Sequence, residues 1–319
     1  MTVELQAAPQ ILTPEYYQRL YDIEENHWWA QGMRQAMISL LTKPLAGKDK
    51  LRVLDIGCGT GYLLHFLRQH YPLDGEPVGL DISEHALKFC QQRGWRDLIQ
   101  GSAVRVPLPS NCFDLIICID TIQHLSPAGA DQTAINEFSR LLAPGGIVYL
   151  RTNSALGRVP LSGADPDQYR RYKLAQVNQM LTRANLEVVR STYLNCVPGV
   201  AGMVKEYLKF NKPADSHSHC QHDRGHVNHS HDHAHASDEH GHDHDHPQGH
   251  NHEHGNHGHS HEPTHKTAAI GPGLAIKNYA PEFSLLNKAM YAVLALEAAL
   301  LKGADLPFGH SSGFVARKR

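Results

Sequence analysis

The feature that most constrains the fold is the stretch 53–61, Val-Leu-Asp-Ile-Gly-Cys-Gly-Thr-Gly. An apolar run begins at Leu51 and ends at Ile56, and apolar residues recur at helical spacing from Tyr62 to Leu67. This order predicts a buried strand, a glycine turn and the start of a helix. Glycine permits positive φ and carries no Cβ, so backbone N–H groups and the helix N-terminus can approach a ligand closely. We therefore expect a ligand at this turn.

The spacing of the glycines separates two classes of ligand. In the dinucleotide fingerprint, G-x-G-x-x-G, the helix N-terminus binds a pyrophosphate. Here Gly57, Gly59 and Gly61 follow the pattern G-x-G-x-G, and Asp55 stands two residues before the first of them. A carboxylate at this mouth would repel a diphosphate but favours a cationic ligand. S-Adenosylmethionine (SAM) carries a sulfonium and an ammonium and has no phosphate, so it suits this turn; a tight turn without a ligand is the alternative.

The second predicted strand, 77–81, ends in a carboxylate, and Ser83 is placed to cap the helix that follows. Asp81 lies about twenty residues after the glycines. An acid at that distance can accept hydrogen bonds from both ribose hydroxyls of an adenosine. The alternative is a carboxylate that only stabilises the positive end of the next helix.

A continuous apolar run at 115–119 predicts a central parallel strand that is buried on both faces. Asp120 and His124 follow it, at the edge where ligands gather in open α/β sheets. His124 is the candidate general base, with Asp120 behind it. The alternative is that His124 only packs against the loop or caps it.

Three motifs resemble one protein family. The sequence 55–61, Asp-Ile-Gly-Cys-Gly-Thr-Gly, resembles the first motif of the class I SAM-dependent methyltransferases. The turn 141–146, Leu-Leu-Ala-Pro-Gly-Gly, also resembles the methyltransferase pattern. The stretch 25–29, Glu-Asn-His-Trp-Trp, is similar to the N-terminal segment of a bacterial subgroup of the methyltransferase type 11 kind. The resemblance implies an α/β fold with a doubly wound, mostly parallel seven-stranded sheet, whose last strand runs antiparallel beside the sixth. It also implies SAM as the methyl donor.

The resemblance further implies roles for individual residues. Asp55 and the backbone of the glycine turn would hold the methionine half of SAM, Asp81 and Ile82 the ribose, and Ser102 with Ala103 the adenine. The family often has an acid at the position of Ser102, and usually Glu-His where this chain has Gln-His at 123–124. The expected cofactor contacts are Asp55, Gly57, Cys58, Gly59, Gly61, Asp81, Ile82, Ser102, Ala103 and Asp120.

Residues 13–43 are predicted to be helical, with Pro14 at the start and apolar residues at turn spacing. Trp28 and Trp29 are adjacent, so they cannot share one face of a helix. Both are packing residues, or they form an aromatic lid whose ring faces contact a sulfonium or an adenine.

The composition changes abruptly at 213–266, which holds nineteen of the 25 histidines and one large aliphatic residue, Val227. Such a segment cannot bury enough apolar surface to offset its chain entropy, so we expect it to be disordered without a ligand. Dense imidazoles with neighbouring carboxylates bind zinc, nickel, cobalt or copper; a tolerated low-complexity loop is the alternative. The predicted metal ligands are His229, His231, His233, His235, His242, His244, His246, His252, His254, His257, His259 and His261.

The net charge is distributed unevenly between this histidine tract, 213–266, and the rest of the chain. The tract carries a net charge of −7 and the remaining residues +5, which gives −2 overall. This charge balance does not point to a nucleic-acid partner. The six cysteines show no C-x-x-C pair, the N-terminus has no secretory pattern, and no apolar stretch is long enough to span a bilayer. We therefore expect a cytoplasmic protein with reduced thiols.

These patterns together predict three segments: 1–212 as the methyltransferase domain through the sixth strand, 213–266 as a histidine-rich insertion, and 267–319 as the completion of the same domain. The predicted function is SAM-dependent methylation of a small-molecule or lipid-like acceptor. The main alternative is a metal-binding or storage protein that uses an inactive methyltransferase scaffold, and a nicotinamide-dependent enzyme is a more distant one. The sequence leaves the acceptor and the oligomeric state open.

Overall fold

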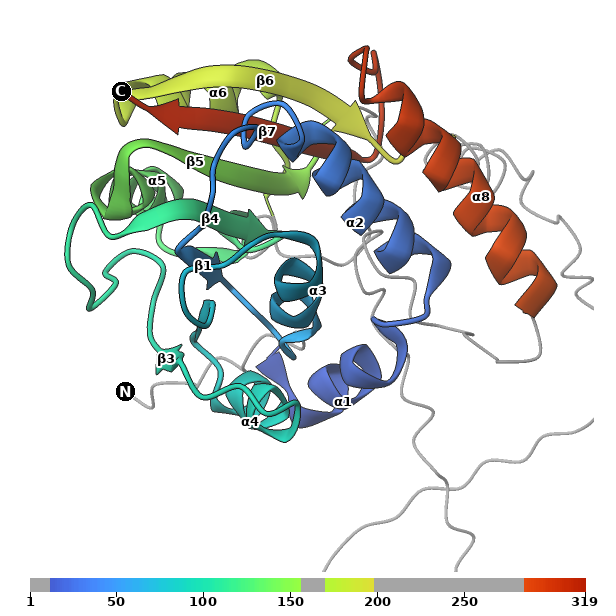
Figure 1. Ribbon diagram of the computed structural model, residues 1–319, viewed down its shortest axis with the longest axis horizontal. Coiled ribbons are helices and arrows are strands. Elements are labelled where there is room, and N and C mark those ends of the chain that lie inside the picture. The colour runs from blue at the N-terminus through green and yellow to red at the C-terminus, as the bar shows by residue number, and fades with distance from the viewer. Residues whose placement is uncertain (1–11, 156–169, 198–283) are drawn as a thin grey trace, which may run out of the picture. The chain divides into compact units, whose positions relative to one another are not determined.

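The structure of the 319-residue chain is a computed structural model that describes residues 12–155, 170–197 and 284–319. These residues contain a seven-stranded sheet with the order β3-β2-β1-β4-β5-β7-β6 (Figure 1). The strands are β1 (Val53–Ile56), β2 (Val78–Asp81), β3 (Leu98–Gln100), β4 (Phe113–Ile119), β5 (Leu142–Asn153), β6 (Leu186–Leu194) and β7 (Ser311–Lys318). The predicted doubly wound, seven-stranded α/β fold is confirmed.

The strand pairing explains where a ligand can lie. β1 pairs in parallel with both β2 and β4, and β4 pairs in parallel with β5. The carboxyl ends of these strands therefore meet along one edge of the sheet, on either side of β1. β7 runs antiparallel to β6, as predicted, and it also runs antiparallel to β5, so it separates the two.

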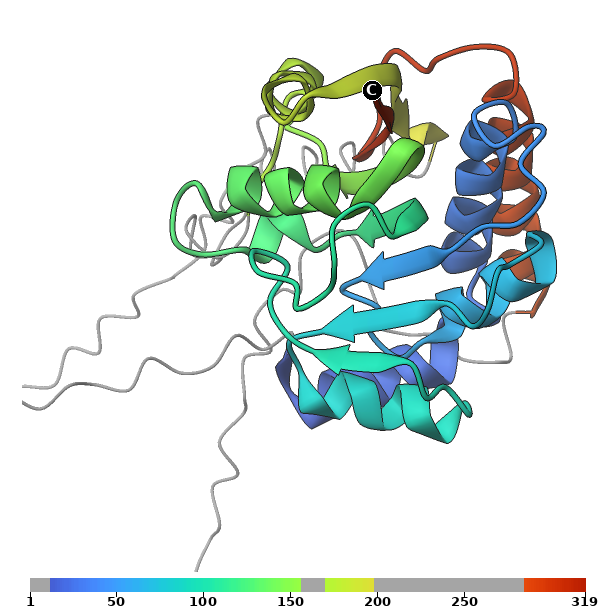
Figure 2. The same ribbon diagram turned by 60° about the vertical axis from the view of Figure 1, so that its left-hand side comes forward.

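Helices cover both faces of the sheet, because alternate residues of the central strands point to opposite sides. Leu115 and Ile117 of β4 pack with apolar residues of α2, α3 and α8, whereas Ile116 and Cys118 pack with residues of α5 and α6. Figure 2 shows α2 and α8 side by side on one face. The helices are α1 (Pro14–Ile23), α2 (Trp28–Leu41), α3 (Tyr62–His70), α4 (Glu84–Gln92), α5 (Ala130–Leu141), α6 (Leu174–Arg183), α8 (Ser284–Leu300) and the short 3₁₀ helix η2 (Ile122–His124).

The prediction of helix throughout 13–43 is wrong, because α1 ends at Ile23 and α2 starts at Trp28. His27 caps α2: its Nδ1 accepts from Trp29 N at 3.3 Å. Asn287 of α8 fixes the break from outside, since its side chain accepts from Trp28 N and donates to the carbonyl of Asn26. The two tryptophans do separate as expected, with Trp29 buried and Trp28 half-buried.

The last described segment belongs to the same sheet as the first. α8 packs closely on α2, where a Cβ on Gly32 would lie 2.4 Å from Leu294. The buried carboxylate of Glu297 in α8 accepts from the backbone N–H groups of Asn195 and Cys196, just after β6. No helix among the described residues is long and apolar enough to cross a membrane. The predicted segment boundaries at 212/213 and 266/267 lie outside the described residues and stay a prediction.

Candidate active site

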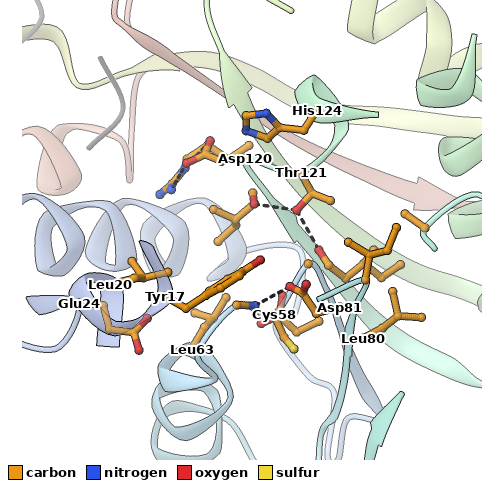
Figure 3. A pocket seen from close by; sticks show the side chains of 18 of the residues that line it. Tyr17, Leu20, Glu24, Cys58, Leu63, Leu80, Asp81, Asp120, Thr121 and His124 are labelled. Carbon is orange, nitrogen blue, oxygen red and sulfur yellow. Dashed lines mark hydrogen bonds and ion pairs between the residues drawn. The ribbon is translucent and has the colours of Figure 1, made fainter. Parts of the chain in front are cut away.

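A cavity of about 620 Å³ lies at the carboxyl edge of the parallel strands. Its walls come from the glycine turn after β1, the ends of β2 and β4, the loop after β3, and helices α1 and α2. Figure 3 shows side chains that line this cavity, including Asp81, Asp120 and His124. The cavity therefore joins the two regions that the sequence predicted separately.

The glycine turn is built for close packing. Gly57, Gly59 and Gly61 all have positive φ, at 78°, 55° and 82°. A Cβ on Gly57 would lie 2.0 Å from the Thr121 hydroxyl in the loop after β4, and one on Gly61 would lie 2.8 Å from Cys90 Sγ in α4. The absence of side chains at these two positions thus lets the turn touch both neighbours.

The backbone of this turn already has internal partners. Gly57 N and Cys58 N both donate to the carbonyl of Leu80, at 2.7 and 3.0 Å, and Gly61 N donates to the carbonyl of Cys58. Gly59 N donates to Asp81 Oδ2 at 3.0 Å. These N–H groups therefore hold the turn against β2, which the sequence analysis did not anticipate when it assigned them to a ligand.

Asp55 contributes a buried, unpartnered carboxylate oxygen to the cavity wall in the described part of the chain. The residue is 1% exposed, and its Oδ2 is buried with no hydrogen-bond partner in the described part of the protein. Burial, followed by the nearby carboxylates of Asp81 and Glu24, raises the pKa of Asp55 to about 8. A buried acceptor of this kind is costly unless a donor or a cation joins it, so it fits an ammonium group.

Asp81 has a different environment. Its Oδ1 accepts from Ser83 N at 2.9 Å and its Oδ2 accepts from Gly59 N, so it links β2, the glycine turn and the start of α4. Burial raises its pKa, and these backbone donors oppose that shift. Each carboxylate oxygen keeps a second lone pair, which suits a ligand hydroxyl. The side chain of Ile82, which also lines the cavity, is 58% exposed.

Three further predicted cofactor contacts also line the cavity. Ala103 is buried, and Ser102 Oγ accepts from Val104 N at 3.4 Å. Cys58 is buried with its Sγ 3.8 Å from Cys90 Sγ, and this contact together with burial raises the pKa of the Cys58 thiol.

Asp120 is held by an arginine that the sequence analysis missed. The Asp120 carboxylate pairs with the buried Arg151 of β5, with Oδ2 2.5 Å from Nη2 and Oδ1 3.3 Å from Nε. The Arg151 guanidinium also lies 4.9 Å from the ring centroid of Trp29. The register Ile119–Arg151 places these residues side by side on neighbouring strands. His124, in η2, lines the same end of the cavity.

Comparison with known proteins decides the family. Residues 54–150 match the family model described as a methyltransferase domain, and this match runs from β1 through most of β5. Residues 54–150 thus form a methyltransferase domain of the class I SAM-dependent kind. The fold and the matched domain therefore agree with the family that the sequence motifs indicated.

Three relatives illustrate the range of the methyltransferase match. The cyclopropane-fatty-acyl-phospholipid synthase of Escherichia coli K12 is 32% identical over 127 residues, which cover 38% of this chain and 31% of that protein. The malonyl-[acyl-carrier protein] O-methyltransferase of Yersinia pestis is 38% identical, covering 31% and 36%. The fatty-acid O-methyltransferase of Mycolicibacterium smegmatis is 30% identical, covering 48% and 54%. The chain thus spans between about a third and about half of the length of these relatives.

The methyltransferase cavity also contains residues that the sequence analysis did not select. Tyr16 and Tyr17 of α1 reach it, and Figure 3 shows Tyr17 extending toward Cys58 and Asp81. Burial and then the carboxylates of Asp120, Asp81 and Glu24 raise the pKa of Tyr16 to about 12. The sequence offered only apolar spacing for this helix, which indicates a packed face without saying that the face lines a cavity.

Arg34 of α2 is the second addition to the site. Its Nη1 and Nη2 donate to the carbonyl oxygens of Glu24 and Glu25, at 2.7 and 2.8 Å, and its guanidinium lies over the Tyr62 ring at 4.6 Å. Its Nε is buried without a partner in the described residues. The carbonyl partners are uncharged, so this wall of the cavity can accept an anion beside the helix that follows the glycine turn.

The predicted metal site is not tested by this structure. All twelve selected histidines, from His229 to His261, lie outside the described residues. Within the described residues, no group of three or more His, Cys, Asp or Glu side chains is placed to hold a metal ion.

Proposed function

We propose that this protein transfers a methyl group from SAM to a small, lipid-like acceptor. The observation that carries the proposal is the buried Asp55, whose Oδ2 has no hydrogen-bond partner among the described residues, in the wall of a cavity at the carboxyl ends of β1, β2 and β4. A cationic ligand would supply a positively charged partner for this carboxylate. Family membership points to SAM as that ligand.

The wall of the cavity offers a partner for each part of SAM. Asp55 would pair with the ammonium and Arg34 with the carboxylate, so that the methionine half lies beside the glycine turn. Asp81 would accept from the ribose hydroxyls, with Ile82 covering the sugar. The adenine would lie against Ser102 and Ala103, and the methyl group would then point toward Asp120 and His124.

When bound, SAM would supply its methyl group to an acceptor lone pair: the new bond to the methyl carbon would form in line with the breaking C–S bond, and S-adenosylhomocysteine would be the leaving group. The contribution of the chain is to hold both reactants in alignment and to exclude water, which can account for much of the rate. Asp120 and His124 stand at the reacting end, where a proton acceptor would act if the acceptor must lose a proton.

The acceptor class is supported by apolar residues in the cavity wall and by the relatives. Leu12, Leu20, Leu63 and Trp29 contribute apolar surface to the cavity. Two of the relatives are named for fatty-acid or fatty-acyl-phospholipid substrates. Labelled SAM, incubated with the protein and a cell lipid extract, should label a fraction soluble in organic solvent; label confined to the aqueous fraction would contradict a lipid-like acceptor.

Cofactor binding has a direct test in titration calorimetry with SAM. We expect saturable binding that falls on the order of 100-fold in Asp81→Ala, because charge-assisted bonds to both ribose hydroxyls are lost. NAD should not compete. If titration of the folded wild-type chain with SAM gave no heat of binding, the proposal would be overturned.

The assignment of Arg34 can be tested with a truncated ligand. 5′-Methylthioadenosine keeps the adenosine and the sulfur but lacks the amino-acid part of SAM. Arg34→Met should weaken SAM binding about 10- to 100-fold, the loss expected for one hydrogen-bonded charge, and leave 5′-methylthioadenosine binding unchanged. An equal loss for both ligands would mean that Arg34 supports the fold of the cavity instead.

A second function, metal binding by the histidine tract, is supported by its composition alone. Nineteen histidines within 213–266 should bind zinc or nickel in calorimetry. Deleting 213–266 should remove this binding and leave SAM affinity unchanged. Loss of SAM binding in the deletion would instead make the tract part of the methyltransferase site.

We also propose a cytoplasmic location, consistent with the five cysteines of the described residues, all of which are free thiols.

A further inference from the structure

The side-chain amide of Gln123 has a fixed orientation next to His124, which lines the cavity. Gln123 is buried in η2, and its Oε1 accepts from Asn153 N and from Thr152 Oγ1, both at 2.9 Å. The backbone N–H of Asn153 can only donate. The amide oxygen must therefore face Asn153, and the amide nitrogen must face the other way.

That nitrogen faces the ring of His124. Gln123 Nε2 lies 3.3 Å from His124 Nε2. An amide nitrogen donates and does not accept, so His124 Nε2 must supply the lone pair of this contact. A neutral imidazole carries one ring proton, which then resides on Nδ1. A proton on Nε2 would set two donors against each other and break the contact.

The other candidate base at this end is also engaged. Both oxygens of Asp120 accept from Arg151, whose side chain is 7% exposed, so the negative charge of Asp120 is balanced by a buried cation. Withdrawing Asp120 to take up a proton would leave Arg151 without that balance. Both potential proton acceptors, His124 Nε2 and the Asp120 carboxylate, are thus already hydrogen-bonded within the protein.

We propose that Gln123 is a positioning residue that holds His124 in the Nδ1–H tautomer, with the Nε2 lone pair directed at the Gln123 amide instead of the acceptor, and so removes it as the general base of the reaction. The acceptor then reacts through a lone pair that is available without giving a proton to His124. The catalytic meaning of this inference rests on the proposed methyl transfer, but the tautomer itself does not depend on it.

The tautomer can be measured directly in the full-length protein labelled with ¹⁵N-histidine. The signals that disappear in His124→Gln belong to His124. At pH 7.5 we expect a pyridine-type Nε2 and a pyrrole-type Nδ1, which resonate in well-separated ¹⁵N ranges. A pyrrole-type Nε2, a doubly protonated ring or an averaged pair of shifts would overturn the inference.

Gln123→Glu is the matched variant, because its carboxylate has the same shape and can still accept from Asn153 and Thr152. Its second oxygen accepts where the amide donated, so Nε2 of His124 should gain a proton, giving the opposite tautomer or the cation. A Nδ1–H tautomer that persists in a variant with unchanged melting temperature would show that Gln123 does not set it. SAM calorimetry on the same samples keeps the two questions apart, since the tautomer result stands whether or not SAM binds.

Discussion

The turns that follow β1 and β4 lie next to each other, yet they meet the cavity in opposite ways. After β1, three glycines with positive φ carry no side chains, and Asp55 near the end of the strand has a buried oxygen with no partner in the part of the chain that the structure describes. After β4, Asp120 also has positive φ, at 52°, but its carboxylate is neutralised by Arg151. Gln123 and His124 are likewise joined to each other.

This contrast assigns different tasks to the two turns. At the first turn, burial keeps the Asp55 carboxyl protonated up to about pH 8, and an incoming cation would favour its ionised form, as the proposed function requires. The second turn satisfies its polar groups internally, so its geometry is set before anything binds. Pre-formed order of this kind suits the reacting end, where misplacement of an atom is costly in rate.

The largest expected effect is on stability at the second turn. Asp120→Asn leaves Arg151 buried without a counter-charge and should lower the free energy of unfolding by about 3–5 kcal/mol, as for other broken buried pairs. The double variant Asp120→Asn, Arg151→Met should recover most of that loss in urea unfolding. If Asp120→Asn cost less than about 1 kcal/mol, the ion pair would not be what organises this turn.

A glycine pair tests the contact between the turns. Gly57 and Gly47 have the same φ, 78°, but a Cβ at Gly47 meets nothing within 4 Å, whereas at Gly57 it would collide with Thr121. Gly47→Ala should cost about 1–2 kcal/mol from the left-handed backbone alone. Gly57→Ala should cost about 1–3 kcal/mol more and weaken SAM binding, since the turn must move. Equal unfolding energies for the two variants would mean that the collision is relieved without cost.

The pH dependence of the first turn follows from Asp55. Its folded-state pKa, about 8, lies above the value near 3.9 expected in the unfolded chain, so the folded protein binds the extra proton between these values. Its contribution to stability therefore falls as the pH rises from about 4 to 8. Asp55→Asn should remove this decline, seen as a smaller change in urea midpoint between pH 5 and pH 8.

The same carboxylate should make SAM binding pH-dependent. Below pH 8 the ion pair forms only when Asp55 loses its proton, so SAM affinity should rise by up to about tenfold per pH unit and then level off. Calorimetry across pH 6 to 8 measures this slope, and Asp55→Asn should bind weakly at every pH. A steep slope that survives in the variant would point to another titrating group.

The smallest expected effect concerns the adenine end. The family resemblance assigns Ser102 to a position where these enzymes often have an acid. Ser102→Asp should strengthen SAM binding by about 3- to 10-fold, because a charged acceptor for an adenine amino group is stronger than a hydroxyl. Ser102→Ala is the matched control and should weaken binding slightly. Weaker binding in Ser102→Asp would place the adenine elsewhere.

Local sequence patterns predicted the parts of the fold whose causes are local. The glycine turn, the cap at Ser83 and the apolar run of β4 each follow from a few neighbouring residues, and the structure confirms them. The seven-stranded sheet followed from the family resemblance. The roles assigned to Asp55, Asp81, Ser102 and His124 stay predictions until a ligand is measured.

What the sequence could not reveal depends on partners far along the chain. The break before α2 is fixed by Asn287, which lies in α8. Arg34 and Tyr16 lie on amphipathic helices, and only tertiary packing decides that their faces line a cavity. The pair Asp120–Arg151 depends on the register between β4 and β5, so a correct strand alignment was the one signal that could have found it.

The position of β7 between β5 and β6 has a consequence for co-translational folding. While a ribosome is still translating 195–310, the residues of β5 and β6 have already been synthesised, but those of β7, which pairs with both strands, have not. Two nascent strands therefore expose unpaired backbone edges for much of synthesis, which invites wrong partners. The sheet can close only after 311–318 has left the exit tunnel, so chaperone dependence should be concentrated in that interval.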